Sequence, residues 1–99
     1  MAPNSPLGMA QLALDDAHRA HDALRQENNI ILRALERADE ELTWAEKQLQ
    51  ESPHDAVCMD DWYHCNANYE DIRIIYDDVF GETERNIKTA LENLERIRI

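Results

Sequence analysis

Residues 7–49 read LGMAQLALDDAHRAHDALRQENNIILRALERADEELTWAEKQL. Small and apolar side chains recur here at alternating spacings of three and four residues, the repeat of an amphipathic helix that packs along a seam. Two of the seam positions, His21 and Asn28, are polar. The pattern predicts one continuous helix over 9–51 whose apolar edge is covered by another helix. The seam consists of Leu7, Ala10, Leu14, Ala17, His21, Leu24, Asn28, Ile31, Leu35, Ala38, Leu42, Ala45 and Leu49.

The second half of the chain repeats the helical pattern after a proline. Pro53 lacks an amide hydrogen and disfavours a helical conformation at Ser52, so we expect a turn over 52–58. A second seam then runs through Trp62, Cys65, Tyr69, Ile72, Tyr76 and Val79, and its spacing slips at Gly81. Glycine inside a helix costs about 1 kcal/mol relative to alanine. We therefore predict helices over 59–80 and 83–98, with a kink or break between them, and a flexible N-terminal tail over 1–8.

These elements predict an all-α fold with a single helical domain over 9–99. The expected architecture is a long antiparallel helical hairpin, coiled-coil-like, that packs into a dimeric bundle, since a lone two-helix hairpin buries little surface for each residue. Asn28 is either a buried polar residue that selects the helix register or a solvated position that selects nothing. The residues expected to carry self-association are Leu24, Asn28, Ile31, Leu35 and Leu42.

The formal net charge of −11 restricts the possible partners. Twenty-one acidic residues against ten basic ones repel a phosphate backbone, so we expect no direct nucleic-acid binding and favour a basic protein surface as partner. The longest run of strongly apolar side chains, at 30–32, is far shorter than a membrane span, so no membrane interaction is expected. Cys58 and Cys65 lie about 10 Å apart on a helix, beyond disulfide reach, which favours free thiols and a cytoplasmic location.

No motif predicts catalysis, a cofactor or a metal. The pairs Asp15-x-x-His18 and Asp61-x-x-His64 have the spacing of di-metal helical bundles, but a turn at Pro53 would separate them by about 36 Å along the hairpin. The chain has two glycines and no glycine-rich phosphate loop. The sequence therefore predicts a non-enzymatic protein.

The most uneven charge lies over 55–84, where nine acidic residues accompany Arg73 alone. This acidic strip either keeps the chain soluble or binds a partner. The aromatic side chains nearby either form core or serve as binding hot spots, and Tyr63 and Phe80 are expected to be exposed because they fall outside the seam. The predicted partner-binding surface is Asp60, Asp61, Tyr63, Glu70, Asp71, Asp77, Asp78 and Phe80.

Two functions are compatible with this surface. The first is a protein–protein interaction module, an adaptor or inhibitor that acts by occupying a partner's surface. The alternative is an acidic nucleic-acid mimic whose carboxylates take the place of phosphates in a basic groove. In size and charge the chain resembles the small acidic helical decoys that phages direct against host nucleic-acid-binding proteins.

Overall fold

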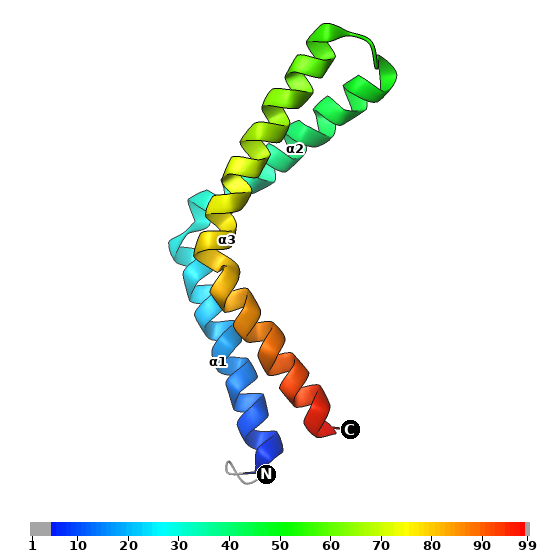
Figure 1. The fold of residues 1–99 in the computed structure, drawn as a ribbon. Helices are drawn as coiled ribbons and strands as arrows, with labels where there is room; N and C mark the ends of the chain where they lie inside the picture. Colours follow the sequence, from blue (N-terminus) through cyan, green and yellow to red (C-terminus); the bar gives the residue numbers. More distant parts are fainter. Residues whose placement is uncertain (1–4, 99) are drawn as a thin grey trace. The chain divides into compact units, whose positions relative to one another are not determined.

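The computed structural model describes residues 5–98, and nearly all of them are helical (Figure 1). Helix α1 spans Pro6–Glu27, α2 spans Asn29–Glu51 and α3 spans Ala56–Arg98. No strand occurs among these residues. The expectation of an all-α fold is confirmed.

The helices form two compact units. Unit 1 contains residues 5–27 and 78–98, so α1 packs with the last part of α3. Unit 2 is Asn28–Asp77, in which α2 packs with the first part of α3. Figure 1 shows each pair of segments side by side, with the turn before Ala56 at one end of unit 2.

Polar side chains cap the beginnings of α1 and α3. Ser5 accepts a hydrogen bond from the Gly8 amide on its Oγ at 3.0 Å, and Pro6 occupies the first helical position, where its missing amide costs nothing. The predicted tail over 1–8 was therefore too long at its C-terminal end, and residues 1–4 lie outside the described part. Asp55 caps α3 by accepting the Val57 amide at 2.8 Å, so this helix begins three residues earlier than expected.

The expected continuous helix over 9–51 is wrong, because it is interrupted at Asn28. This residue has φ −118° and ψ 34°, outside the helical region, and its carbonyl accepts the Ile31 amide at 3.0 Å. Asparagine is a poor helix former because its side chain competes for backbone hydrogen bonds, and Asn29 follows directly. Two weak helix formers in sequence thus separate α1 from α2.

The expected helix break near Gly81 is also wrong. Helix α3 continues through Gly81, which is buried and has no positive φ. Its neighbour Phe80 is fully buried, and the packing of that ring offsets the propensity cost of one glycine. A bend at Gly81 stays a prediction.

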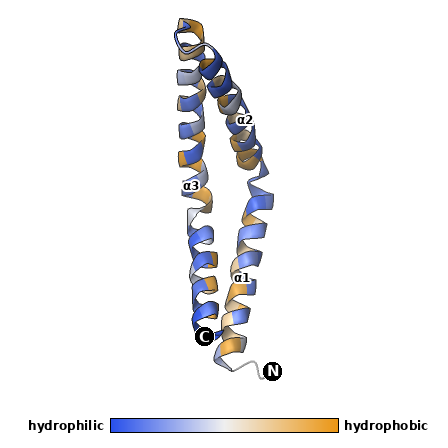
Figure 2. Cartoon of the chain, turned by 90° about the vertical axis from the view of Figure 1, so that its right-hand side faces the viewer, coloured by the Kyte–Doolittle hydropathy of each residue, from blue (hydrophilic) through white to orange (hydrophobic). Residues whose placement is uncertain are grey.

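The predicted seam does face inward within each unit. Every seam residue from Leu7 to Leu49 is buried or half-buried, as are Trp62, Tyr69 and Tyr76 on α3. Figure 2 shows the corresponding alternation of hydrophobic and hydrophilic segments along the helices. In unit 1, Leu14 from α1 forms a small core with residues of α3, and the full cluster is Leu14, Ala90 and Leu94 with Leu7, Ala10 and Ile87 packed against it.

Candidate partner-binding surface

The exposed face of α3 in unit 2 combines carboxylates with large apolar side chains. Met59, Tyr63 and Ile74 are exposed, the last two by 66% each. Separations of four, eleven and fifteen residues bring these side chains toward one side of a helix. The acidic residues lie between and beside them. We call this the α3 outer surface, made of Met59, Asp60, Tyr63, Glu70, Asp71, Ile74 and Asp77.

Most of the predicted partner-binding residues lie on this surface. Asp61 is half-buried beside the seam residue Trp62, and so contributes less than its neighbours. Asp78 is exposed but belongs to unit 1. The sequence pattern missed Met59 and Ile74, which fall outside the seam; their apolar character at outward heptad positions was the signal that could have identified them.

Phe80 was predicted to be exposed, and that prediction is wrong. Its side chain has no exposed area and packs edge-on against His21, with ring centroids 5.9 Å apart and an interplanar angle of 71°. Phe80 lies four residues after the seam residue Tyr76 and three before Thr83, so it shares a helical face with them and its ring reaches the inward side of α3. Phe80 therefore belongs to the core of unit 1 and contributes nothing to a binding surface.

Two hydrogen bonds beside Phe80 connect His21 on α1 to Thr83 on α3 and Thr83 to the α3 backbone. The Thr83 hydroxyl donates to the carbonyl oxygen of Phe80 at 3.0 Å, and His21 Nδ1 lies 2.7 Å from the same hydroxyl oxygen. Nδ1 donates or accepts in this hydrogen bond according to the tautomer of the imidazole. His21 thus acts as a structural seam residue that links α1 to α3.

Local ion pairs on the α3 outer surface are exposed and weak. Asp77 pairs with Arg73 at 3.5 Å, one helical turn away, and Asp60 lies 3.3 Å from His64 Nε2 with the same spacing, an ion pair only when the imidazole is protonated. The Arg73 guanidinium also lies 5.4 Å from the centre of the Tyr76 ring. Exposed pairs of this kind contribute about 0–1 kcal/mol, so they do little to neutralise the surface.

Negative charge is concentrated in unit 2. Asn28–Asp77 contains twelve acidic and four basic residues, a net charge of −8. The described residues of unit 1 contain nine acidic and six basic residues, a net charge of −3. An electrostatic field that attracts cationic partners therefore originates mainly from unit 2.

The predicted self-association residues face the inside of their own units. Leu24 lies in unit 1, and Asn28, Ile31, Leu35 and Leu42 lie in unit 2, all of them half-buried. Packing within one chain has therefore already covered part of each side chain. Other apolar residues are more exposed, including Ile30 at 83% and Trp44 at 54%.

The two thiols are poorly suited to nucleophilic chemistry. Burial raises the pKa of the Cys58 thiol, and the carboxylates of Asp55 and Asp61 raise it further. Burial, followed by Glu41 and Asp61, likewise raises the pKa of the Cys65 thiol. A raised pKa keeps sulfur in the neutral form, which is not the nucleophile. Both cysteines are free thiols.

Within residues 5–98, no group of three or more His, Cys, Asp or Glu side chains is arranged to hold a metal ion. None of the helices in this same part of the chain has a stretch long and apolar enough to span a membrane.

Comparison with protein-family models, with curated proteins and with solved structures finds no match to this chain.

Proposed function

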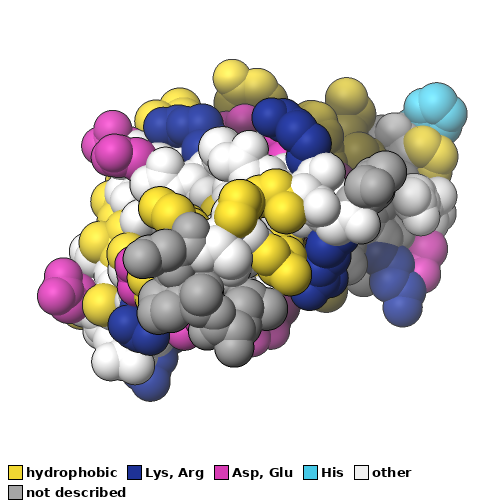
Figure 3. Space-filling model, turned by 90° about the horizontal axis from the view of Figure 1, so that it is seen from below, with side chains coloured by type: hydrophobic (Ala, Val, Ile, Leu, Met, Phe, Trp, Pro, Cys, Tyr) yellow, Lys and Arg dark blue, Asp and Glu magenta, His cyan; other side chains and the backbone are white. Residues whose placement is uncertain are grey.

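We propose that the protein is a non-enzymatic protein-binding module, an adaptor or inhibitor that occupies a basic surface of its partner. The observation that carries this proposal is the α3 outer surface, where Tyr63 and Ile74 are each 66% exposed among acidic side chains. A surface that served solubility alone would carry the charges without the large apolar side chains. Figure 3 views the molecule from the end of unit 1, where hydrophobic and charged side chains also adjoin at the surface.

The two kinds of side chain contribute differently to binding. Ile74 is 66% exposed and Met59 53% exposed, so burial of the remaining surface contributes less than the roughly 1.5–3 kcal/mol of a fully exposed apolar side chain. The carboxylates accelerate the encounter with a cationic surface and disfavour acidic competitors. Together they suit a partner whose binding site is basic at its rim and apolar at its centre.

Nucleic-acid mimicry is the second candidate, favoured by the net charge of −8 on unit 2. Carboxylates held along a rigid helix would occupy a groove that normally binds phosphates. Such binding would weaken steeply with salt and would be displaced by DNA or RNA, because the same basic side chains would be contested. Docking that also depends on Tyr63 and Ile74 would keep part of its affinity at high salt, because salt screens the carboxylates but not the apolar contacts.

The test compares variants of the immobilised protein in capture of partners from a cell extract, with quantitative mass spectrometry. Charge reversal (Asp71→Lys with Asp77→Lys) and apolar removal (Ile74→Ser) should each reduce capture of the same protein. Glu92→Lys with Glu95→Lys is the matched control, since it changes the net charge equally at exposed positions of unit 1.

The pattern of losses separates the two functions. Loss on charge reversal and on apolar removal supports the protein-binding module. Loss on charge reversal alone, with displacement by DNA, supports the mimic. Equal loss with the control variant would refute both, since net charge rather than the α3 outer surface would then determine capture.

We also infer that the protein self-associates, which the predicted dimeric bundle requires. Large apolar side chains stay exposed in each unit, such as Met9 at 60% in unit 1 and Ile30 at 83% in unit 2, and contact between copies would cover surface of this kind. The free thiols favour a reducing, cytoplasmic location for this assembly.

A further inference from the structure

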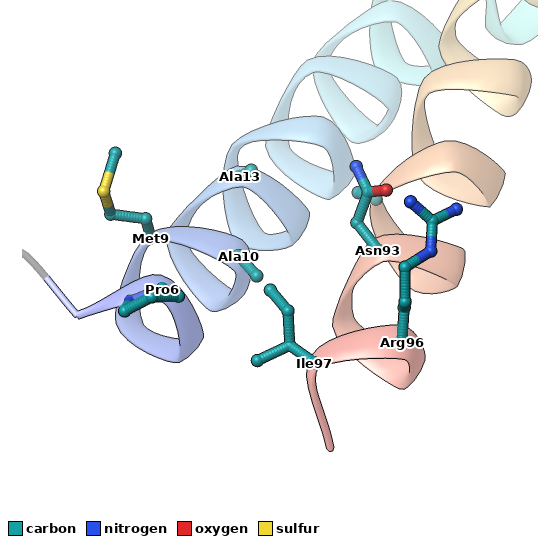
Figure 4. Close-up of a pocket in the computed structure, with 8 residues that line it drawn as sticks. Pro6, Met9, Ala10, Ala13, Asn93, Arg96 and Ile97 are labelled. Atoms are coloured by element: carbon teal, nitrogen blue, oxygen red, sulfur yellow. The ribbon is translucent and has the colours of Figure 1, made fainter. Parts of the chain in front are cut away.

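Each unit carries a hollow between its helical segments, and the two hollows differ in chemistry. The hollow of unit 1, drawn in Figure 4, has a volume of about 400 Å³ and is lined mainly by alanines and other apolar side chains, with Asn93 and Arg96 on the α3 side. The hollow of unit 2 has a volume of about 370 Å³, and its lining includes a tryptophan and a carboxylate. We call it the Trp62 hollow. Its lining residues are Glu46, Leu49, Gln50, Pro53 and Trp62.

Local helix geometry brings the lining of the Trp62 hollow together. Leu49 and Gln50 lie three and four residues after Glu46 near the end of α2, so the three residues share one face of that helix. Pro53 follows in the turn, and Trp62 comes from α3. The seam residues Leu49 and Trp62 are half-buried, whereas Glu46 and Gln50 are exposed. The hollow therefore has an apolar inner part and a polar edge that is open to solvent.

An aromatic ring and a carboxylate in one hollow suit an organic cation. Among aromatic side chains, the face of tryptophan attracts a cation most strongly, and Glu46 adds a formal negative charge. Leu49 and Pro53 offer apolar surface to an aliphatic chain. An occupant with an aliphatic stem and a cationic head matches both parts of the hollow, and the side chains of arginine and lysine are built in this way.

The charges around the Trp62 hollow also favour a cationic occupant. Residues 46–62 contain five acidic residues and Lys47 as the only lysine or arginine. The C-terminal end of α2 lies in this segment and carries the partial negative charge of the helix dipole, and its last turn has no basic residue. Glu51 adds a negative charge at that same end. A cation from outside the chain would therefore offset local repulsion.

Arginine fits the Trp62 hollow better than lysine. A planar guanidinium can stack on an aromatic ring and donate hydrogen bonds to a carboxylate at the same time, whereas an ammonium group is a strongly hydrated point charge. Unit 2 already contains this combination on α3. The guanidinium of Arg73 lies 5.4 Å from the centre of the Tyr76 ring, and its Nε lies 3.5 Å from Asp77 Oδ1.

We propose that the Trp62 hollow binds an arginine side chain of a partner protein, with the guanidinium between the Trp62 ring and the Glu46 carboxylate and the aliphatic stem against Leu49. This inference rests on the proposed binding of a basic partner and names a side chain through which that partner is held. Trp62 lies three residues after Met59 of the α3 outer surface, so neighbouring parts of one helix can contact the same partner.

The first test follows the fluorescence of Trp62. The chain has two tryptophans, and Trp44 lies outside the hollow with 54% of its surface exposed, so Trp44→Phe leaves Trp62 as the only indole. Circular dichroism checks that this variant keeps the helical fold. The probe is the blocked tripeptide Gly-Arg-Gly at low salt, which should change the emission of Trp62 in a saturable way.

Two matched peptides test the chemistry of the occupant. Citrulline in place of arginine keeps the shape of the side chain without its charge, and lysine keeps the charge without the planar group. Both peptides should bind more weakly than the arginine peptide. Equal binding of the citrulline peptide would overturn the proposal, since the hollow would then select an apolar stem, and equal binding of the lysine peptide would overturn the preference for a guanidinium.

The second test locates the site. Glu46→Gln should raise the dissociation constant of the arginine peptide about two- to fivefold, because it removes one exposed ion pair. Glu36→Gln is the matched control, since Glu36 is an exposed glutamate of α2 outside the hollow and the net charge changes equally. It should leave the dissociation constant unchanged. Equal weakening by the two variants would show that the overall charge of unit 2 binds the peptide, and the assignment to the hollow would be wrong.

The peptide titration and the capture of a partner from an extract can fail separately. If the arginine peptide does not bind while capture still depends on Ile74, the arginine site is wrong and the protein-binding module stands. If the peptide binds and responds to Glu46→Gln while capture ignores the α3 outer surface, the arginine site stands and the proposed role of that surface is wrong.

Discussion

Replacement of Phe80 by alanine tests the most consequential departure of the structure from the sequence pattern. Phe80 is the largest side chain with no exposed area among the described residues, and its ring packs against His21 from α1. Alanine would leave a cavity between α1 and α3 and would remove the aromatic contact. The change should therefore destabilise unit 1 in particular.

The magnitude follows from burial. Truncation of a fully buried phenylalanine typically costs about 3–5 kcal/mol, which combines lost transfer free energy with the cavity left behind. A domain of this size has a free energy of unfolding of roughly 5–15 kcal/mol, so the loss is a large fraction of the total. Leucine at the same position fills most of the space and should cost less than about 1.5 kcal/mol.

The assay is urea unfolding followed by circular dichroism at one fixed protein concentration, because self-association makes apparent stability depend on concentration. Amide hydrogen exchange then shows which helices lose stability. In Phe80→Ala, amides of α1 should lose protection more than amides of α2, since α1 belongs to unit 1 and α2 to unit 2.

Tyr63→Ala provides the matched comparison, because Tyr63 is an aromatic residue of the same helix with 66% of its surface exposed. Its free energy of unfolding should stay within about 0.5 kcal/mol of the wild-type value. If Phe80→Ala and Tyr63→Ala changed the free energy of unfolding equally, the assignment of Phe80 to the core would be refuted. Phe80 would then be an exposed residue, as the sequence pattern predicts.

Three further results are expected. Asp55→Ala should cost about 1 kcal/mol in unfolding experiments because it removes the cap of α3, and an unchanged midpoint would contradict that role. Gly81→Ala should stabilise the protein by up to about 1 kcal/mol, because alanine favours the helix more than glycine does. The added Cβ would meet the end of the Arg85 side chain at 3.1 Å, and that flexible side chain can move aside. A lower melting temperature would mean that the helix cannot accept the methyl group. The raised pKa of the Cys58 and Cys65 thiols predicts that both react with iodoacetamide at pH 8 more slowly in the folded protein than in urea, and equal rates would argue against their protected state.

Much of the secondary structure followed from local chemistry. The seam from Leu7 to Leu49 correctly identified which side chains turn inward, because helical periodicity places every third or fourth residue on one face regardless of what covers it. Pro53 correctly indicated the turn, since a residue without an amide hydrogen cannot continue a helix. Asn28 does lie half-buried at its seam position, but its weak helix propensity, which the seam spacing does not reflect, accompanies the break between α1 and α2.

Local rules of composition and periodicity therefore suffice to predict a helical, acidic and amphipathic chain with one inward face along each segment. Tertiary packing decided what local rules could not: that α3 continues through Gly81, that Phe80 lies in the core rather than on a binding surface, and that an alanine-lined groove remains open between α1 and α3. The physical reason is that propensity acts within a few residues, whereas burial of Phe80 against His21 joins residues far apart in the chain, and the free energy of such contacts outweighs the roughly 1 kcal/mol by which one glycine disfavours a helix.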